Sequence, residues 1–519
     1  MLFNSYIFIF VFLPITLLVY FAIGGRGNHR IAIAWLVGAS LLFYGWWNPA
    51  YLWLILASVL FNYGIGVYLS GDQNPARKLW LIAGIIGNLG LIAYYKYSNF
   101  FVDNFNQLFE SSYHLETILL PLAISFFTFQ QISYLIDAYR GETKEYNFLH
   151  YCLFVTFFPQ LIAGPIVHHK EMLPQFAKDL VYKINHKDVA VGLTIFCIGL
   201  FKKVVLADGV AVYATPVFDA AEHGVALTFF EAWGGSIAYT LQIYFDFSGY
   251  SDMAIGLARM FGILLPLNFH SPYKSKNIIE FWRHWHMTLS RFLRDYVYIA
   301  LGGNKKGKTR RYINLMATML LGGLWHGAAW TFVAWGALHG FYLICNHAWH
   351  MIRKSLGQDL SKTTLWGTTL ATLTTFLCVL VAWVFFRAES FGGAMQILNA
   401  MAGSNGISLP AGVANQMPWL SDMGFIFDGM FINRLGPGWG EGVKLMLILL
   451  FIAFFLPNTQ QIMRDYKPAL QVYDHDLCVQ RFTWVFWKPT LVHTLTISCV
   501  FYYSISHLTK VTEFLYFNF

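Results

Sequence analysis

The sequence holds 519 residues, of which 57% are hydrophobic, 18% aromatic and only 12% charged, and its mean hydropathy is +0.50. These values exclude an ordinary soluble or disordered chain and are typical of an integral membrane protein. The formal net charge is +8, but the basic residues gather in loops between apolar segments, so we do not interpret the charge as nucleic-acid binding.

Predicted membrane helices follow one another along the chain, because apolar runs near the roughly 20 residues that a bilayer requires recur from end to end. The runs cover residues 5–23, 31–47, 51–69, 79–95, 117–138, 189–207, 229–247, 313–349, 365–386, 443–457 and 490–503. We therefore predict an all-α polytopic membrane protein with roughly 10–12 membrane helices plus re-entrant segments. It is expected to be one membrane domain over residues 1–519. Within it we distinguish N-terminal helices in 1–145, a core in 146–360 and C-terminal helices in 361–519.

Basic residues predict the orientation, since they collect in short cytoplasmic loops. They follow the first, third and fifth runs, whereas the acidic stretch 103–116 follows the fourth. This alternation places the N-terminus outside. The lysines between residues 170 and 187 mark another cytoplasmic segment, so residues 151–164 are expected to enter the membrane and return on the same side.

The stretch "LLGGLWHGAAWTFVAWGALHG", residues 320–340, is almost wholly apolar yet carries His326. Basic clusters at residues 303–311 and 353–354 flank it, and if both are cytoplasmic, residues 312–352 form a hairpin that turns among small residues near Gly327. Its helical rise places His326 about 20 Å below the cytoplasmic face. An imidazole at that depth marks a pathway or a site, and its neutral form can accept a proton. The alternative is a hydrogen-bonded core histidine.

The segment "EFWRHWHMTLSRFLRDYVYIALGG", residues 280–303, predicts an amphipathic helix at the membrane interface, which we place at residues 278–300. Aromatic and aliphatic residues fall on one face of this helix, and Arg283, Arg291 and Arg294 lie on the rest of its surface. His286 lies at the border between the two faces. The plain interpretation is a surface anchor. The functional one is a dock for the phosphates of an anionic substrate.

Other polar residues occur in apolar surroundings. Asp246 lies between aromatic residues in "YFDFSGYSDMAIGLARMFG", where Asp252 is expected to cap a helix. His168 and His169 are adjacent in "AGPIVHHKEMLPQF". The HExxH motif is absent, and the pairs His284/His286 and His347/His350 lack a companion carboxylate at metal-ligand spacing, so we predict no metal site. Residues 403–442 are rich in Gly, Asn and Pro, and we expect them to form an external cap or partner-binding surface.

These motifs, with "AWVFFRAES" and "LPNTQQI", resemble the membrane-bound O-acyltransferase family, and within it the bacterial alginate O-acetyltransferase branch. The resemblance runs in order from near the N-terminus to about residue 460. It implies a helical bundle thinned into a funnel from each side, with His326 as the catalytic histidine and His286 as the second polar residue of the reaction chamber. We add Asp246, Trp325 and Ser290 as further candidates for the chamber.

The resemblance implies an O-acetyltransferase in the bacterial inner membrane, where the alternation of basic residues places the N-terminus in the periplasm. Acetyl-CoA would be the donor substrate, no cofactor would be bound, and His326 would be the general base. We expect the donor phosphates to meet the cytoplasmic basic residues Arg283, Arg291, Arg294, Lys305 and Lys306. The acetyl group would reach an exported, alginate-like polysaccharide through a periplasmic SGNH-type acetyltransferase and a polysaccharide synthase or export complex.

Three alternatives stay open at this point. A polytopic transporter or flippase of an anionic or lipid-linked substrate would also use deep polar residues and a basic face. A glycosyltransferase would need paired acidic residues in an early external loop, where residues 103–116 offer isolated ones. A family member could also acylate peptidoglycan or another envelope polymer.

Overall fold

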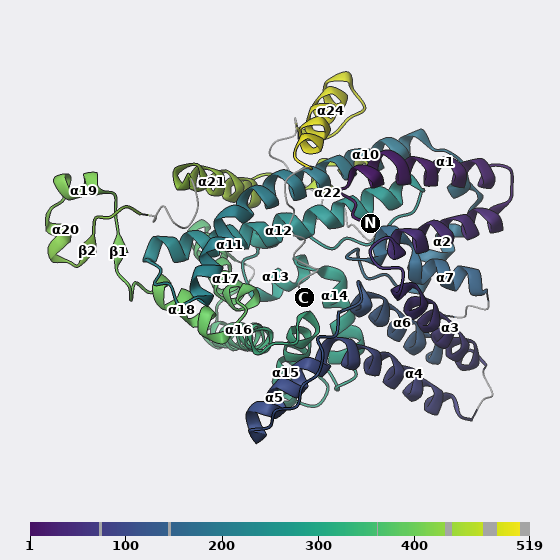
Figure 1. The fold of residues 1–519 in the computed structure, drawn as a ribbon, viewed down its shortest axis with the longest axis horizontal. Helices are drawn as coiled ribbons and strands as arrows, with labels where there is room; N and C mark the ends of the chain where they lie inside the picture. The colour runs from purple at the N-terminus through teal and green to yellow at the C-terminus, as the bar shows by residue number, and fades with distance from the viewer. Residues whose placement is uncertain (72–74, 144–146, 361, 431–437, 471–484, 509–519) are drawn as a thin grey trace. The chain divides into compact units, whose positions relative to one another are not determined.

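In a computed structural model the described residues are mainly helical (Figure 1). The structure describes residues 1–71, 75–143, 147–360, 362–430, 438–470 and 485–508. The described residues divide into two compact units: unit 1 holds those within 1–201, 248–268 and 459–508, and unit 2 holds those within 202–247 and 269–458. The prediction of one membrane domain stays a prediction.

Unit 1 consists of helices that are largely apolar. Their bounds are η1 Phe8–Phe12, α1 Leu13–Gly24, α2 His29–Gly45, α3 Tyr51–Leu69, α4 Arg77–Ile92, η2 Ala93–Tyr97, α5 Ser98–Phe109, α6 Ile124–Tyr139, α7 Phe148–Thr156, α8 Phe158–Leu161, α9 His169–Phe176, η3 Asp179–Tyr182, α10 His186–Phe201, α22 Thr459–Ile462, η8 Arg464–Tyr466 and α24 Leu491–Ser506. The unit also contains the last part of α12 (Phe229–Met260), whose first part belongs to unit 2.

Unit 2 contains the segments in which the candidate chemistry was predicted. Its other elements are η4 Lys202–Ala207, α11 Asp208–Glu222, η5 Pro272–Lys274, α13 Ile278–His284, α14 Met287–Phe292, η6 Leu293–Tyr298, α15 Lys308–His326, α16 Trp330–Ser355, α17 Leu365–Arg387, α18 Phe391–Met401, β1 Ile407–Ser408, α19 Ala411–Gln416, α20 Trp419–Asp422, β2 Phe425–Ile426 and α21 Trp439–Phe455.

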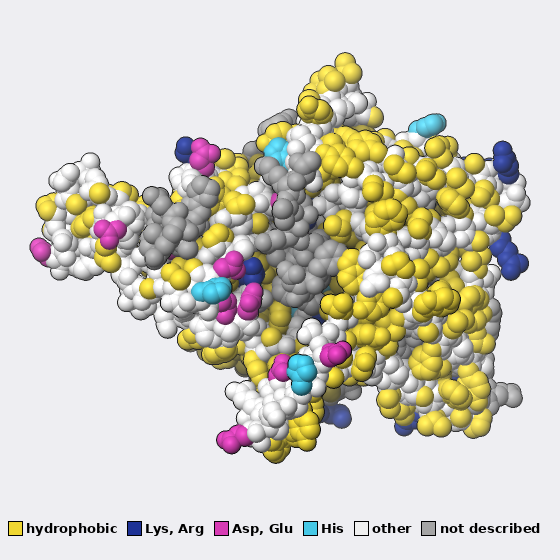
Figure 2. Space-filling model, in the orientation of Figure 1, with side chains coloured by type: hydrophobic (Ala, Val, Ile, Leu, Met, Phe, Trp, Pro, Cys, Tyr) yellow, Lys and Arg dark blue, Asp and Glu magenta, His cyan; other side chains and the backbone are white. Residues whose placement is uncertain are grey.

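Long apolar helices and a hydrophobic surface both fit a multi-pass membrane protein. Four helices among the described residues are long and apolar enough to cross a membrane, namely Tyr51–Leu69, Arg77–Phe109, His186–Glu222 and Leu365–Arg387. Large apolar side chains are exposed on many helices, and Figure 2 shows them over wide areas of one face. Such surface is costly in water and is expected to meet lipid.

Helices α15 and α16 form a hairpin joined by residues 327–329. A Cβ on Gly323 would overlap the carbonyl oxygen of Phe332, and one on Gly336 would overlap the carbonyl oxygen of Met319. The two backbones therefore approach closely where glycines face each other, the packing expected between helices in a membrane. This approach fixes the end of α15, where His326 lies.

Two other segments take forms that bear on the sequence predictions. Residues 151–164 lie in α7 and α8, which break at Phe157 and are too short to cross a bilayer. The segment 403–442 was expected to be irregular, but its described part contains two short helices and a two-stranded parallel sheet in which Ile407 pairs with Phe425. Residues 431–437 of that segment lie outside the described residues.

Candidate active site

His326 is the last residue of α15, where the chain leaves the helix because Gly327 takes an extended conformation. The side chain is buried, with 5% of the residue exposed. Its ring lies 5.1 Å from that of Trp335 on α16 and 5.0 Å from that of Phe386 on α17. The imidazole is therefore held by aromatic edges and faces from three helices.

His286 lies in a break that the sequence analysis did not predict. The expected continuous helix over residues 278–300 is wrong, because α13 ends at His284, Trp285 is extended and His286 has φ of 42°. A left-handed conformation is uncommon for a residue with a side chain and costs about 1–2 kcal/mol. Such strain persists where the surroundings hold a residue in one position, and it is frequent at functional sites.

The break turns His286 into the interior. The residue is fully buried, and its ring lies 4.7 Å from that of Phe247 and 6.4 Å from that of Phe269. Burial lowers the pKa of His286 to about 3, because an imidazolium loses its hydration there. The ring is therefore neutral at physiological pH.

Trp325 brings the two histidines into one cluster. Its indole lies 4.8 Å from the ring of His326 and 6.1 Å from the ring of His286. Ser290, another candidate for the chamber, donates its hydroxyl to the carbonyl of Trp285 at 3.3 Å. This bond lies across the break, so Ser290 supports the turn that positions His286.

A third buried imidazole, His339, was missed by the sequence analysis. Its ring lies 4.8 Å from that of Trp335, which also contacts His326, and 5.1 Å from that of Trp282. The signal was present, because His339 follows Trp335 by four residues and so lies on the same face of α16. Aromatic rings thus connect His286, His326 and His339.

Asp246 lies in a different polar cluster. Lys203 contacts Asp246 at 2.5 Å and Asp208 at 2.8 Å, and all three side chains are buried. Phe247, the next residue of α12, contacts His286 instead. Successive residues of a helix point about 100° apart. This part of α12 therefore contacts the histidine cluster through Phe247, while Asp246 points in a different direction.

The predicted donor-binding cations lie in several places. Arg283, Lys305 and Lys306 are exposed, and Arg291 is half-buried. Arg294 forms a two-bond pair with its neighbour Asp295, at 2.7 and 3.1 Å. Their role toward a donor stays a prediction.

Two further expectations concern polar residues of unit 1. Asp252 does not cap a helix, because it lies inside α12, where its carboxylate accepts from the Thr459 hydroxyl at 2.6 Å and the Gln460 amide at 3.2 Å. His168 lies 3.6 Å from Asp137, and His169 pairs with Thr143. Among the described residues no group of three His, Cys, Asp or Glu side chains is placed to hold a metal ion.

Comparisons with known proteins relate this chain to a family of membrane acyltransferases. Residues 138–382 match the model of the membrane-bound O-acyltransferase family. The chain is 42% identical over 489 residues to a peptidoglycan O-acetyltransferase of Helicobacter pylori, covering 89% of this chain and 90% of that protein. It is 43% identical over 413 residues to a probable alginate O-acetylase of Pseudomonas aeruginosa, covering 77% and 75%. It is also 30% identical over 291 residues to a teichoic acid D-alanyltransferase of Streptococcus thermophilus, covering 52% and 69%.

Proposed function

This chain belongs to the membrane-bound O-acyltransferase family, and from that premise we propose that it transfers acetyl from acetyl-CoA toward a bacterial envelope polysaccharide, with His326 as general base. The observation that carries the proposal is the pair of buried imidazoles, His326 and His286, on one indole. The positions of both imidazoles follow from local backbone features, namely the end of α15 and the break between α13 and α14.

The chemistry needs few groups. A neutral imidazole of His326 takes the proton of the acceptor hydroxyl while its oxygen attacks the thioester carbonyl. An ester C–O bond forms, the C–S bond breaks, and the proton passes from the imidazole to the departing thiolate. The thioester is already activated, so the residues present suffice for a base-assisted transfer. We assign His286 to orienting the acceptor or to stabilising the oxyanion.

The acceptor is proposed to be a glycan hydroxyl, for which the comparisons offer two candidates. The relative named for peptidoglycan covers 89% of this chain, whereas the relative named for alginate covers 77%. This wider match supports peptidoglycan. An alginate-like exported polysaccharide is the second candidate, supported by the marginally higher identity of that relative.

The membrane arrangement completes the proposal. We place the protein in the inner membrane with its N-terminus in the periplasm, based on the distribution of basic residues. The donor enters from the cytoplasm, where Arg283, Arg291, Arg294, Lys305 and Lys306 meet its phosphates. We expect a periplasmic SGNH-type acetyltransferase to assist the delivery of the acetyl group to the polymer.

The test is acetyl transfer by the purified full-length protein in detergent, with radiolabelled acetyl-CoA and a soluble glycan fragment of each type. Replacing His326 with alanine is expected to lower the rate by roughly 10²–10⁴-fold, the usual contribution of a general base. His114→Ala, which removes an exposed imidazole, is the control. Equal rates for wild type and His326→Ala would refute the mechanism, and transfer to one fragment alone would identify the acceptor.

A further inference from the structure

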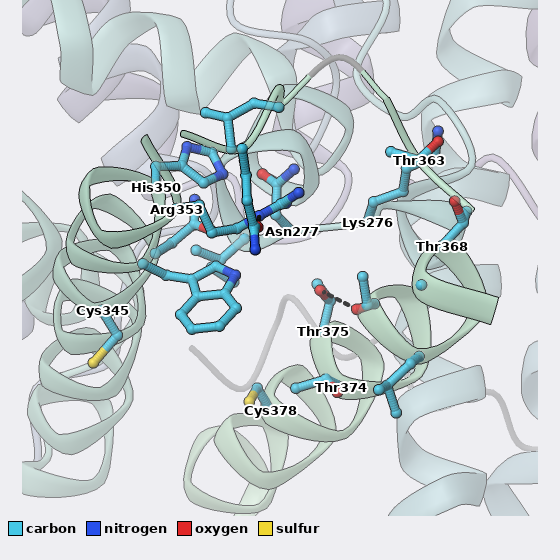
Figure 3. Close-up of a pocket in the computed structure, with 18 of the residues that line it drawn as sticks. Lys276, Asn277, Cys345, His350, Arg353, Thr363, Thr368, Thr374, Thr375 and Cys378 are labelled. Carbon is cyan, nitrogen blue, oxygen red and sulfur yellow. Dashed lines mark hydrogen bonds between the residues drawn. The ribbon is translucent and has the colours of Figure 1, made fainter. Parts of the chain in front are cut away.

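A cavity of about 970 Å³ lies in unit 2 beside the ends of two long helices (Figure 3). The last turns of α16, the first half of α17, the connection between them and residues 276–278 line it. In Figure 3, His350 and Arg353 project from α16 on one side, and Thr363 and Thr368 lie near the start of α17 on the other. Nothing in the proposed reaction uses this cavity.

One part of the cavity carries positive charge. Lys276, Arg353 and Lys362 line it, together with His350, and its described lining includes no aspartate or glutamate. Arg353 is partly fixed, because its Nε donates to Gln358 at 2.8 Å. Three cations without a lining carboxylate favour an anionic group, and guanidinium and ammonium groups suit a phosphate ester.

The start of α17 is a second, independent source of positive charge at the cavity. This helix has 23 residues, and its first turn opens at the cavity, where Thr364 accepts from the Gly367 backbone N–H at 3.1 Å. Backbone N–H groups at a helix start carry partial positive charge and bind phosphates in many proteins. The dipole of α17 therefore acts on the same space as the three cations.

The rest of the cavity is suited to an apolar chain. Tyr342, Cys345, Leu370, Ala371 and Cys378 line its apolar part. The surface beside it is strongly apolar, since Trp349 is 57%, Leu365 81% and Trp366 84% exposed. α17 is also one of the four helices long and apolar enough to cross a membrane, so its end lies where lipid headgroups are found.

We propose that this cavity binds a phosphate ester that carries an apolar chain, and that its occupant is an anionic phospholipid of the surrounding leaflet. The phosphate meets Lys276, Arg353, Lys362 and the start of α17, and an acyl chain follows the groove toward Cys378. Acetyl-CoA shares the phosphate chemistry, but its two-carbon acyl group supplies no apolar chain for the apolar part of the lining. The lipid therefore uses both halves of the lining.

Two cysteines of the lining serve as built-in probes. Cys345 is exposed and Cys378 half-buried, while Cys499 is exposed and belongs to unit 1. The full-length protein is placed in nanodiscs of phosphatidylcholine alone or of phosphatidylcholine with phosphatidylglycerol. Peptide mass spectrometry then follows maleimide labelling of each cysteine. We expect phosphatidylglycerol to slow labelling of Cys345 and Cys378 at least severalfold and to leave Cys499 unchanged.

Two variants distinguish the contribution of the lining cations from that of the cavity volume. Replacing Lys276, Arg353 and Lys362 together with glutamine is expected to weaken phosphatidylglycerol protection by roughly tenfold or more, since each cation near a membrane surface contributes to binding. Ala371→Trp fills the apolar part of the cavity without a change in charge and should abolish protection. The matched control replaces the exposed cations Arg26, Lys178 and Lys183 with glutamine and should keep it.

Three outcomes would overturn the proposal. Equal labelling in both bilayers would show that no anionic lipid enters. Protection of the cysteines by coenzyme A or inorganic phosphate, in phosphatidylcholine alone, would assign the cavity to a soluble phosphate instead. Loss of protection in the control variant would indicate general surface charge. Acetyl transfer is not the readout, so the result is independent of the proposed function.

Discussion

The ring of Trp325 lies 6.1 Å from that of His286, although the two residues are 39 positions apart in the chain. One residue comes at the end of α15, and the other comes from the break between α13 and α14. Because Trp325 also contacts His326, the indole sets the spacing of the two imidazoles. The relationship implies that the cluster depends on backbone geometry as much as on the side chains.

Substitutions at His286 can separate strain from chemistry. His286 has φ of 42°, which glycine adopts without cost and alanine does not. We expect His286→Gly to be about 1 kcal/mol more stable than His286→Ala, while both lose most of their acetyl transfer. Thermal unfolding in detergent and the transfer assay measure the two effects. Equal stability of the two variants would contradict the strain, and full activity in either would contradict the role of the imidazole.

Trp325 is expected to position the histidines rather than touch the reacting atoms. Trp325→Ala should lower kcat roughly 10²-fold, because small displacements of catalytic groups are costly, with a smaller change in KM. Trp325→Phe keeps a ring and should retain part of the rate. Trp53→Ala removes a tryptophan that is 78% exposed and serves as control. A change confined to KM would instead assign Trp325 to substrate binding.

Lys203 is expected to stabilise the fold through its two carboxylate partners. Lys203→Met leaves Asp208 and Asp246 buried together, which should destabilise the protein by about 3–5 kcal/mol. Unfolding in detergent against denaturant measures this loss, and the half-buried Lys202 gives the control Lys202→Met. Adding Asp208→Asn and Asp246→Asn to Lys203→Met should restore much of the stability. No recovery in the triple variant would rule out charge burial as the cause.

Sequence patterns predicted the parts of the site that depend on local composition. The hairpin followed from flanking basic clusters and small residues, and its turn lies at residues 327–329. The depth of His326 in the membrane stays a prediction. The break at His286 left no such trace, because neither Gly nor Pro marks it and a helical wheel assumes continuity. Contacts between residues far apart in the chain were also hidden, as Asp252 and Thr459 show at a sequence separation of 207.

Close packing between α15 and α16 predicts a sharp response to added volume. Gly323→Ala places a Cβ against the backbone of Phe332, which cannot yield as a flexible side chain can. We expect lower thermal stability and loss of transfer, since His326 lies three residues further along α15. Gly38→Ala is the matched control, because nothing lies within 4 Å of its added Cβ and alanine favours a helix. Unchanged stability of Gly323→Ala would show that the hairpin can open there.

His339 offers a test of how far the reactive cluster extends. The residue is fully buried, and among the described residues neither ring nitrogen has a hydrogen-bond partner. A buried polar atom without a partner costs about 1–3 kcal/mol of stability. The side chains around this ring are aromatic and suit an apolar ring. His339→Phe is therefore expected to raise thermal stability and to leave acetyl transfer within about twofold of wild type, since His339 reaches His326 only through Trp335. His339→Ala, which leaves a cavity in the same cage, should instead lower stability. If His339→Phe folded normally but lost transfer as His326→Ala does, the third imidazole would belong to the reaction, and proton movement would have to include α16.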